Sequence, residues 1–484
     1  MKSMNINTTI PVLGPARIPS PLISQGVTRD GKTRFMKDEH RISVDVRVDR
    51  VLGENKDSIL SFEQAGPREK IYFDPSKLKC AVANCGGLCP GLNDIIRSIV
   101  LELYHVYGVK NIFGIRYGLQ GFIPKYGHDL IELNPQRVSG IQNTGGSILG
   151  SSRGGQDIGE IVDCLERIGV GLLFMVGGDG TLMASKAIGE EILKRGLKIS
   201  VVGIPKTIDN DIFLVSRSFG FDTAVDVATL AIRGAHNEAE AYPNGIGLIK
   251  LMGRHSGFLA ATAALAQTDA NFVLIPEEEI LLHGENGLLA AVERRLALRK
   301  HAVIIVAEGA GQNFFKDKGD EHDASGNVKL KDIGLFLKAE INAYFESKEI
   351  PITLKYIDPS YIIRSLPANA NDSVFCGLLA RDAVHAGMAG KTNLLISFWN
   401  NNYVHVPMDA SAGRRKKIDP AGRLWQSVLE STGQNSLFNF RSDTIVNFHK
   451  PIILYGNQKQ RFVGGTGLIK TCASGGPVKN KLPL

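Results

Sequence analysis

The chain has 484 residues, of which 43% are hydrophobic and 22% are charged, and its formal net charge is +7. This length provides material for about two to three folded domains, and the absence of an apolar run of about 18 residues argues against a transmembrane helix. Lysine and arginine are spread along the chain without a basic stripe interleaved with aromatic residues, so we expect no nucleic-acid or membrane partner, and the positive charge favours anionic substrates.

The first 77 residues are predicted to form an irregular N-terminal extension. They contain Pro11, Pro15, Pro19 and Pro21, and the first acidic residue is Asp30. A transit peptide also lacks acidic residues, but it needs an amphipathic helix, which these prolines disfavour. We therefore expect an arm that packs on a neighbouring subunit, and, because no signal peptide is recognisable at the start, a cytoplasmic protein.

From residue 79 the sequence alternates between strand, glycine turn and helix. The run KCAVANCGG (79–87) predicts a strand and a turn, followed by a helix whose start lies near Pro90. Such a turn presents backbone N–H groups to an anion. This alternation, including the strand-like run HAVIIVAEG (301–309), continues to about residue 395 and predicts an α/β fold.

One βαβ unit carries acidic residues at the end of each of its strands. The runs LLFMVGG (172–178) and ISVVGIP (199–205) read as strands, with a helix over 182–195 between them. Because neighbouring parallel strands end on the same side of a sheet, Asp179 and Asp209 are expected to face one crevice. Carboxylates at such a place hold Mg2+ or accept a proton.

Two further sets of residues have ordinary interpretations. The six cysteines lack paired spacing, which favours a reduced intracellular set over a metal or disulfide framework. The basic run at 414–417 is expected to be a solvated face, with an effector-phosphate site as the alternative.

Five short segments stand in a specific order: CGGLCPGLN (85–93), GGSILGSSR (145–153), GGDGT (177–181), PKTIDND (205–211) and MGRHSG (252–257). GGDGT alone could be a strand-end turn with a helix cap, and it also occurs in NAD and diacylglycerol kinases. The five segments together, over about residues 79–395, resemble 6-phosphofructokinase. The resemblance is to the long ATP-dependent enzymes of plants and trypanosomatids more than to the compact bacterial ones.

This resemblance implies two similar three-layer α/β/α domains with mostly parallel sheets and an active site in the cleft between them. The implied organisation is an N-terminal extension (1–77), a nucleotide-binding domain (78–225, with the chain returning at about 366–395), a fructose 6-phosphate-binding domain (226–365) and a C-terminal segment and tail (396–484). It also implies an allosteric glycolytic enzyme and a homotetramer whose substrate site is shared between subunits.

The implied reaction is phosphorylation of the 1-hydroxyl of D-fructose 6-phosphate by MgATP. Asp209 would be the general base, Thr207 would orient the reacting groups and Arg153 would stabilise charge on the phosphoryl oxygens. Asp179 and Asp211 would hold the Mg2+ cofactor. The implied ATP-binding residues are Gly87, Arg153, Gly178, Asp179, Gly180, Thr181 and Lys206. Leu119 replaces a tyrosine usual near the nucleotide, so it is left out of this set.

The implied substrate-binding residues are Thr207, Asp209, Asp211, Met252, Gly253, Arg254, Glu277, Lys355, Tyr361 and Arg364. Glu277 would accept hydrogen bonds from sugar hydroxyls. In the family the residue matching Lys355 comes from a neighbouring subunit.

Two residues indicate the phosphoryl donor, and each favours a different one. Gly180 is the ATP-type residue, whereas Lys206 is typical of pyrophosphate users, although plant and trypanosomatid enzymes combine both and use ATP. We therefore favour ATP, with a pyrophosphate-dependent phosphotransferase as the alternative. A non-catalytic regulatory subunit that binds sugar phosphate is a third hypothesis, which the presence of Asp179, Asp209, Thr207 and Arg153 disfavours.

Overall fold

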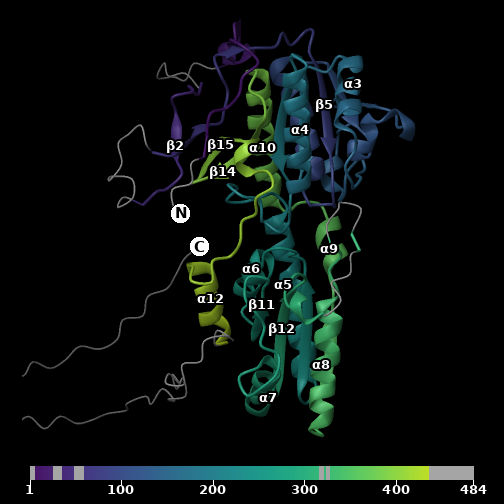
Figure 1. The fold of residues 1–484 in the computed structure, drawn as a ribbon, viewed down its shortest axis with the longest axis vertical. Helices are drawn as coiled ribbons and strands as arrows, with labels where there is room; N and C mark the ends of the chain where they lie inside the picture. The colour runs from purple at the N-terminus through teal and green to yellow at the C-terminus, as the bar shows by residue number, and fades with distance from the viewer. Residues whose placement is uncertain (1–5, 26–34, 48–58, 316–320, 323–327, 435–484) are drawn as a thin grey trace, which may run out of the picture. The chain divides into compact units, whose positions relative to one another are not determined.

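The larger of the two main sheets has nine strands, and helices pack against it (Figure 1). The structure is a computed structural model that describes residues 6–25, 35–47, 59–315, 321–322 and 328–434. The strand order is β2-β3-β15-β14-β9-β8-β5-β6-β7. The strands are β2 (Arg41–Ser43), β3 (Ser61–Gln64), β5 (Lys79–Asn84), β6 (Asn111–Ile115), β7 (Ile131–Glu132), β8 (Leu172–Gly177), β9 (Ser200–Pro205), β14 (Leu394–Trp399) and β15 (Asn402–Pro407).

The centre of this sheet is parallel and its edges are antiparallel. Strands β14, β9, β8, β5 and β6 pair in parallel, whereas β7, β15, β3 and β2 join in antiparallel register. The central strands read as continuous apolar runs because helices bury both of their faces. The strands predicted at 172–178 and 199–205 are confirmed to within one residue.

Alternate side chains of each central strand enter two different cores. In β8, Phe174 faces the helices α2 (Leu92–Leu101) and α10 (Ala370–Met388), and its neighbours Leu173 and Met175 face α3 (Ile158–Ile168) and α4 (Asp179–Lys194). This period of two is the side-chain period of a strand. The result is a three-layer α/β/α arrangement.

A second, four-stranded parallel sheet repeats the pattern, with the order β11-β12-β10-β13. Its strands are β10 (Gly245–Leu251), β11 (Phe272–Leu274), β12 (His301–Ala307) and β13 (Thr353–Ile357), and its helices are α5 (Phe221–Ala241), α6 (Phe258–Ala266), α7 (Leu288–Arg299) and α8 (Ile333–Ser347). One face packs against the alanine-rich α5 and α6, and the other packs on α7 and α8. The predicted fold class, with two α/β/α domains, is therefore confirmed.

Shorter elements connect these layers. They are β1 (Ile18–Pro19) paired with β4 (Lys70–Ile71), the helices α9 (Ser360–Ser365), α11 (Met408–Ser411) and α12 (Arg423–Thr432), a π-helical turn at Glu102–Tyr107, and 3-10 turns at Pro21–Gln25, Gly118–Phe122, Pro124–Tyr126, Ile141–Asn143 and Gln312–Phe314. In the described part of the chain, no helix combines the length and the apolar character needed to cross a membrane.

The N-terminal extension is less irregular than predicted. Its strands β2 and β3 continue the large sheet beyond β15, and the fully buried Phe62 of β3 packs edge-on against Trp399 of β14. These residues therefore pack on their own chain, whereas we expected an arm on a neighbour. Likewise, the C-terminal segment contributes β15, α11 and α12, and the predicted tail beyond residue 434 lies outside the described residues.

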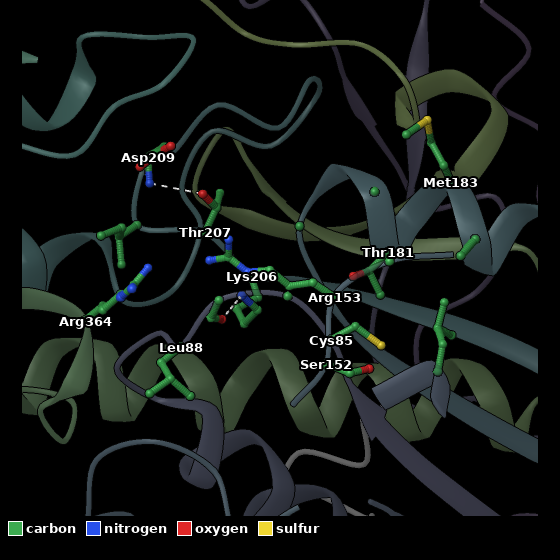
Figure 2. A pocket seen from close by; sticks show the side chains of 18 of the residues that line it. Cys85, Leu88, Ser152, Arg153, Thr181, Met183, Lys206, Thr207, Asp209 and Arg364 are labelled. Carbon is green, nitrogen blue, oxygen red and sulfur yellow. Dashed lines mark hydrogen bonds between the residues drawn. The ribbon is translucent and has the colours of Figure 1, made fainter. Parts of the chain in front are cut away.

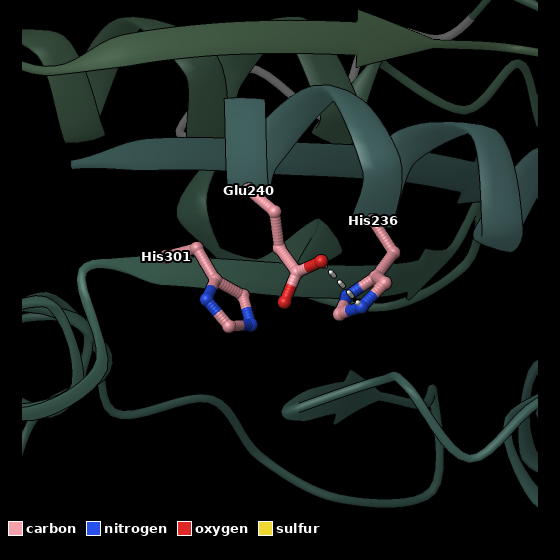
Figure 3. Close-up of side chains that lie close together, drawn as sticks. All are labelled: His236, Glu240 and His301. Carbon is pink, nitrogen blue, oxygen red and sulfur yellow. Dashed lines mark ion pairs between the residues drawn. The ribbon is translucent and has the colours of Figure 1, made fainter. Parts of the chain in front are cut away.

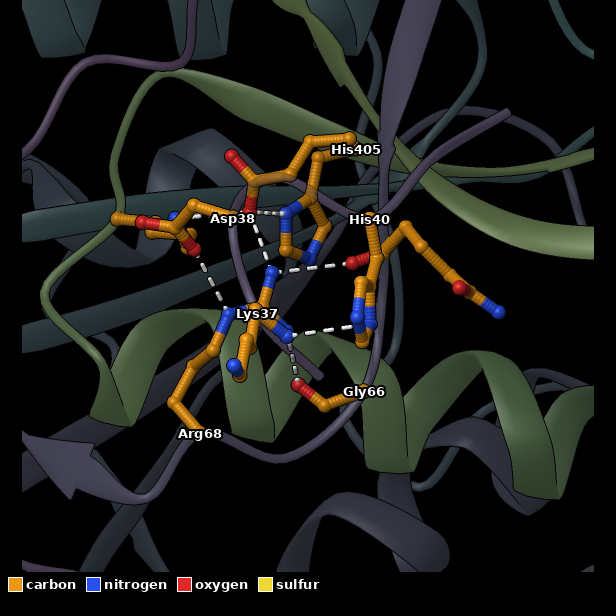
Figure 4. Close-up of polar contacts among 9 residues, drawn as sticks. Lys37, Asp38, His40, Gly66, Arg68 and His405 are labelled. Atoms are coloured by element: carbon orange, nitrogen blue, oxygen red, sulfur yellow. Dashed lines mark hydrogen bonds and ion pairs between the residues drawn. The ribbon is translucent and has the colours of Figure 1, made fainter. Parts of the chain in front are cut away.

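A buried ionic cluster anchors the extension to the sheet (Figure 4). Glu63 of β3 accepts hydrogen bonds through one carboxylate oxygen from Arg68 (2.5 Å) and Lys391 (2.8 Å), and the same oxygen lies 3.0 Å from His405 Nδ1. Burial alone would raise the pKa of Glu63, but the hydrogen bonds and charges of His405 and Lys391 outweigh it and hold the pKa below its usual value. Asp38 adds a second carboxylate beside Arg68 and Lys391.

We expect Glu63→Gln to lower the free energy of unfolding by about 3 kcal/mol, because it leaves Arg68 and Lys391 buried with the exposed Asp38 as their remaining ion-pair partner in the described chain. Urea unfolding followed by tryptophan fluorescence measures this change. The difference from wild type should shrink below about pH 4, because a carboxylate with a lowered pKa stabilises the fold only while ionised. Glu430→Gln, which removes an exposed pair with Arg423, is the control; an equally small effect at Glu63 would refute the role of the cluster.

Candidate active site

A cavity of about 330 Å³ lies where the carboxyl ends of four strands meet (Figure 2). Residues directly after β5, β8, β9 and β10 line it, together with the loop at 152–155, Arg364 of α9 and Arg415. Open parallel sheets bind ligands at this edge. Ten of the predicted site residues line the cavity: Gly87, Arg153, Gly178, Gly180, Thr181, Lys206, Thr207, Asp209, Met252 and Arg364.

The turn from β8 into α4 shapes one wall of the cavity. A Cβ atom at Gly177 would overlap the Thr181 side chain, so this tight turn requires glycine. Helix α4 begins directly after it at Asp179, with Gly178 as its N-cap. The first turn of a helix has N–H groups without intrahelical partners and carries partial positive charge, so this wall suits a phosphate group.

Three cationic side chains gather around Gly87. A Cβ atom at Gly87 would lie 3.5 Å from Arg153 Nη2 and 3.6 Å from Arg364 Nη1. The ammonium of Lys206 donates a hydrogen bond of 2.6 Å to the Gly87 carbonyl oxygen. Burial lowers the pKa of Lys206. Among the described residues no carboxylate lies within 4 Å of this Cβ position, and the gathered positive charge makes this end of the cavity suitable for phosphoryl oxygens.

Asp209 provides a carboxylate oriented for proton transfer. Its backbone N–H donates to Thr207 Oγ1 (3.1 Å), and its Oδ2 lies 3.5 Å from the backbone nitrogen of Arg254. Oδ1 is buried and has no hydrogen-bond partner among the residues that the structure describes. Burial, together with the charges of Asp211 and Glu308, raises the pKa of Asp209 to about 7. A carboxylate with an unpaired, buried oxygen and a pKa near neutrality suits a general base.

The two carboxylates predicted to hold metal share one cation, which is Arg415. Its guanidinium lies 2.6 Å from Asp211 Oδ2 and 3.5 Å from Asp179 Oδ2. Asp179 also accepts a hydrogen bond from the backbone of Gly413 (2.8 Å). Burial raises the pKa of Asp179 despite these two partners. Two buried carboxylates that converge on one cation are hard oxygen donors and fit the ligand preference of Mg2+.

The basic run at 414–417 is therefore not wholly a solvated face. Arg414 and Lys417 are exposed, but Arg415 lines the cavity and Lys416 donates hydrogen bonds to the carbonyl oxygens of Val215 (2.8 Å) and Ser216 (3.0 Å). An antiparallel bridge between Ile212 and Arg415 holds the run against the acidic loop. Burial lowers the pKa of Lys416 to about 8.

Several predicted substrate residues lie outside this cavity. Gly253 and Arg254 follow the lining residue Met252, and Arg254 reaches Asp209 through its backbone. Lys355 is exposed on β13, with its ammonium 5.5 Å from the ring centroid of Tyr242. Tyr361 is 75% exposed, and its ring lies under the guanidinium of Arg364 at 4.7 Å. The cavity of a single chain thus excludes Lys355 and Tyr361.

The carboxylate of Glu277 is held by backbone hydrogen bonds. Its oxygens accept from the backbone nitrogens of Gly257 (3.0 and 3.1 Å) and Ile418 (2.9 Å). These bonds tie the start of α6 to the C-terminal segment. Because two ionised oxygens can accept about four hydrogen bonds, the role of Glu277 as a sugar ligand stays a prediction.

Glu308 is the acidic residue that the sequence interpretation missed. It follows β12 as Asp179 follows β8, so the same rule about strand ends could have found it. Burial raises its pKa, and the charges of Arg254, Lys250 and Arg364 oppose this rise. Glu308 therefore lies in the electrostatic environment of Asp209 and Arg254. Leu119, which we left out, lines the cavity.

The sequence matches a family model described as "Phosphofructokinase" over residues 79–387. A protein from Borreliella burgdorferi named "ATP-dependent 6-phosphofructokinase" is 50% identical over 440 residues, covering 90% of this chain and 98% of that protein. Proteins of the same name are 47% identical in Amycolatopsis methanolica (88% of this chain, 95% of that protein) and 48% identical in Trypanosoma brucei brucei (78% and 77%).

Solved structures with the same fold are more distant in sequence. A pyrophosphate-dependent phosphofructokinase from Marinobacter aquaeolei superposes with a TM-score of 0.61 at 18% identity, covering 74% of this chain and 91% of that one. Phosphofructokinase from Saccharomyces cerevisiae gives a TM-score of 0.57 at 22% identity, with coverages of 74% and 50%. At these identities the similarity establishes the fold and not the phosphoryl donor.

Proposed function

The chain belongs to the phosphofructokinase family, and from this premise we propose that it transfers the γ-phosphoryl group of ATP to the 1-hydroxyl of D-fructose 6-phosphate. The products are fructose 1,6-bisphosphate and ADP. The observation that carries this proposal is Asp209, which has a carboxylate oxygen without a hydrogen-bond partner in the described chain and lines one cavity with Arg153, Lys206 and Arg364. A base beside a phosphate-binding surface is what in-line transfer to a hydroxyl requires.

Asp209 accepts the proton of the 1-hydroxyl while the sugar oxygen attacks the γ-phosphorus and the bond to the β-phosphate oxygen breaks. Thr207 fixes the loop through the backbone N–H of Asp209. Arg153, with the backbone around Gly87, stabilises the charge that builds on the transferred group. The first turn of α4 and Thr181 hold the nucleotide phosphates.

Asp179 and Asp211 are the residues that would hold Mg2+, which neutralises charge on the nucleotide phosphates when it is bound. In the structure Arg415 supplies the counter-charge to both carboxylates. Arg415 also lines the cavity, so it is within reach of a bound phosphate. We include it in the proposed site.

The sugar phosphate is proposed to lie between Met252, Arg254, Glu277 and Arg364, with Glu308 beside the two arginines. Lys355 is exposed and outside the cavity of its own chain, which supports its proposed contribution to the site of a neighbouring subunit. The proposed assembly is a homotetramer. The proposed setting is cytoplasmic glycolysis, under allosteric control.

ATP is the proposed donor. Gly180 leaves room at the start of α4, because a Cβ built there meets no heavy atom of the described chain within 4 Å apart from its chain neighbours and the backbone of its own helix. The ammonium of Lys206, the pyrophosphate-type residue, is directed to the Gly87 carbonyl oxygen. The relatives near 50% identity are named as ATP-dependent, which also supports this donor.

The test is the initial rate with fructose 6-phosphate and Mg2+, with ATP or pyrophosphate as donor in the same coupled assay. We expect turnover with ATP and little or none with pyrophosphate. Turnover with pyrophosphate alone would overturn the donor assignment. No turnover with either donor, in protein that still binds fructose 6-phosphate, would favour the regulatory-subunit hypothesis.

A further inference from the structure

A second group of ionisable side chains lies at the opposite end of the smaller sheet. His236 and Glu240 are one turn apart near the end of α5, and His301 is the first residue of β12 (Figure 3). The register pairs His301 with Gly245, the first residue of β10. Because α5 leads directly into β10, the fold places all three side chains together.

This group is remote from the proposed active site. Glu308 and Met252 lie beyond the carboxyl ends of β12 and β10, whereas His301 and Gly245 begin these strands. A seven-residue strand is roughly 20 Å long at about 3.3 Å per residue. The group therefore plays no direct part in phosphoryl transfer and needs its own explanation.

The distances suit a small cation. One potential ligand atom from each of the three residues lies within 4.8 Å of the other two. His236 Nε2 and Glu240 Oε2 are 3.5 Å apart, close to the edge of roughly 3.3 Å that follows from metal–ligand bonds of about 2.0–2.1 Å in a tetrahedron. Asp269 Oδ1 lies 4.0 Å from the same nitrogen of His236.

The surroundings leave one nitrogen of the His301 imidazole available as a metal ligand. His301 Nδ1 lies 3.1 Å from the carbonyl oxygen of Arg299, which can only accept, so Nδ1 carries the proton and Nε2 keeps its lone pair. This is the arrangement by which an outer hydrogen bond orients a metal-binding histidine. Burial, with the charges of Arg295 and His236, lowers the pKa of His301 and favours the neutral ring.

Ordinary packing explains the group less well. His236 Nδ1 is buried and lacks a hydrogen-bond partner in the described part of the chain, so no hydrogen bond at this atom fixes the ring. The two imidazole rings are only 5.2 Å apart between centroids. A cation bound between the two imidazoles, with Glu240 and Asp269 beside them, would stabilise this arrangement of side chains.

We propose that His236, Glu240 and His301 form a binding site for a divalent transition-metal ion, with Zn2+ as the best fit and Asp269 or water as the fourth ligand. Two imidazoles and a carboxylate match zinc, whereas Mg2+ prefers oxygen ligands alone. A bound ion would tie the end of α5 to the start of β12 and so stabilise the smaller domain.

The experiment measures Zn2+ binding to the full chain after treatment with a chelator, by competition with a chromophoric chelator. We expect one ion per chain with micromolar affinity or better. His301→Gln and Glu240→Gln should each weaken binding about a hundredfold or more, since even outer-shell changes cost about 10–100-fold. His283→Gln is the matched control: His283 pairs with Glu340 at the same 3.5 Å but belongs to no three-residue group in the described residues.

A second readout keeps the test decisive if a variant folds poorly. Co2+ added to the wild-type chain should give the intense visible absorption of a tetrahedral site, and Zn2+ should abolish it. Zn2+ should also raise the melting temperature of wild type and of His283→Gln, but not of His301→Gln. Absence of the cobalt spectrum, or equal zinc affinity in wild type and His301→Gln, would overturn the proposal. Neither readout depends on phosphoryl transfer.

Discussion

Asp209→Asn is expected to lower kcat by about a thousandfold, within the range of about 10²–10⁴ that a positioned general base contributes. The asparagine side chain has nearly the same size, and the backbone bond from residue 209 to Thr207 does not depend on the carboxylate. The amide cannot accept the proton of the 1-hydroxyl. Because this loss acts in the transition state, the affinity for fructose 6-phosphate should stay largely intact.

Steady-state kinetics and direct measurement of fructose 6-phosphate binding separate these two effects. The control is Glu279→Gln, which removes the same charge from an exposed position in the domain proposed to carry the sugar site. An unchanged kcat in Asp209→Asn would remove Asp209 from the mechanism. A parallel loss of binding would instead assign it to substrate recognition.

The raised pKa of Asp209 also predicts how the activity of the wild-type enzyme depends on pH. Burial raises the pKa of Asp209 to about 7, and the charges of Asp211 and Glu308 add to this. A base acts only when ionised, so kcat/KM should fall as the pH drops through this pKa and level off above it. The Asp209→Asn variant, with its residual activity, should lack this step.

The strands and the acidic edge of the sheet could be predicted from sequence because their signals are local. Runs such as 172–178 are apolar throughout, since helices cover both faces of a central parallel strand. The side on which neighbouring parallel strands end then follows from topology alone. Asp209 was placed correctly beside the cavity for this reason, and the same argument would have placed Glu308 at the carboxyl end of β12.

The features that the sequence did not predict depend on contacts between residues far apart in the chain. Arg415 enters the site because its backbone pairs with Ile212 and its side chain meets Asp179 and Asp211. Nothing within the run 414–417 distinguishes it from its exposed neighbours Arg414 and Lys417. Strand β3 has only four residues, and its partner β15 lies far along the chain, so no local period revealed it.

Gly180→Asp is expected to lower kcat/KM for ATP by about a hundredfold, and to lower the value for pyrophosphate much less. Gly180 lines the cavity in the first turn of α4, and a Cβ atom there meets no heavy atom of the described chain within 4 Å beyond its chain neighbours and its own helix backbone. The new carboxylate would therefore occupy the space open to the nucleotide. A hundredfold loss equals about 2.7 kcal/mol, below the roughly 4 kcal/mol between two unit charges at 4 Å near a protein surface.

The fold should tolerate this substitution, so lost activity would not reflect unfolding. An acidic residue in the first turn of a helix interacts favourably with the helix dipole, and the melting temperature of Gly180→Asp should match that of wild type or exceed it. Gly180→Asn adds the same volume without charge and separates repulsion from steric exclusion. We expect it to retain more ATP activity than Gly180→Asp.

The decisive quantity is the ratio of kcat/KM for ATP to that for pyrophosphate, with weak pyrophosphate turnover measured at high enzyme concentration. A fall in this ratio in Gly180→Asp, larger than in Gly180→Asn, would mean that charge at residue 180 discriminates between the donors. Equal losses with both donors would contradict the prediction. In that case another residue would have to determine the choice of donor. Lys206 would be the residue to substitute next, because its ammonium could leave the Gly87 carbonyl oxygen and bind a phosphate.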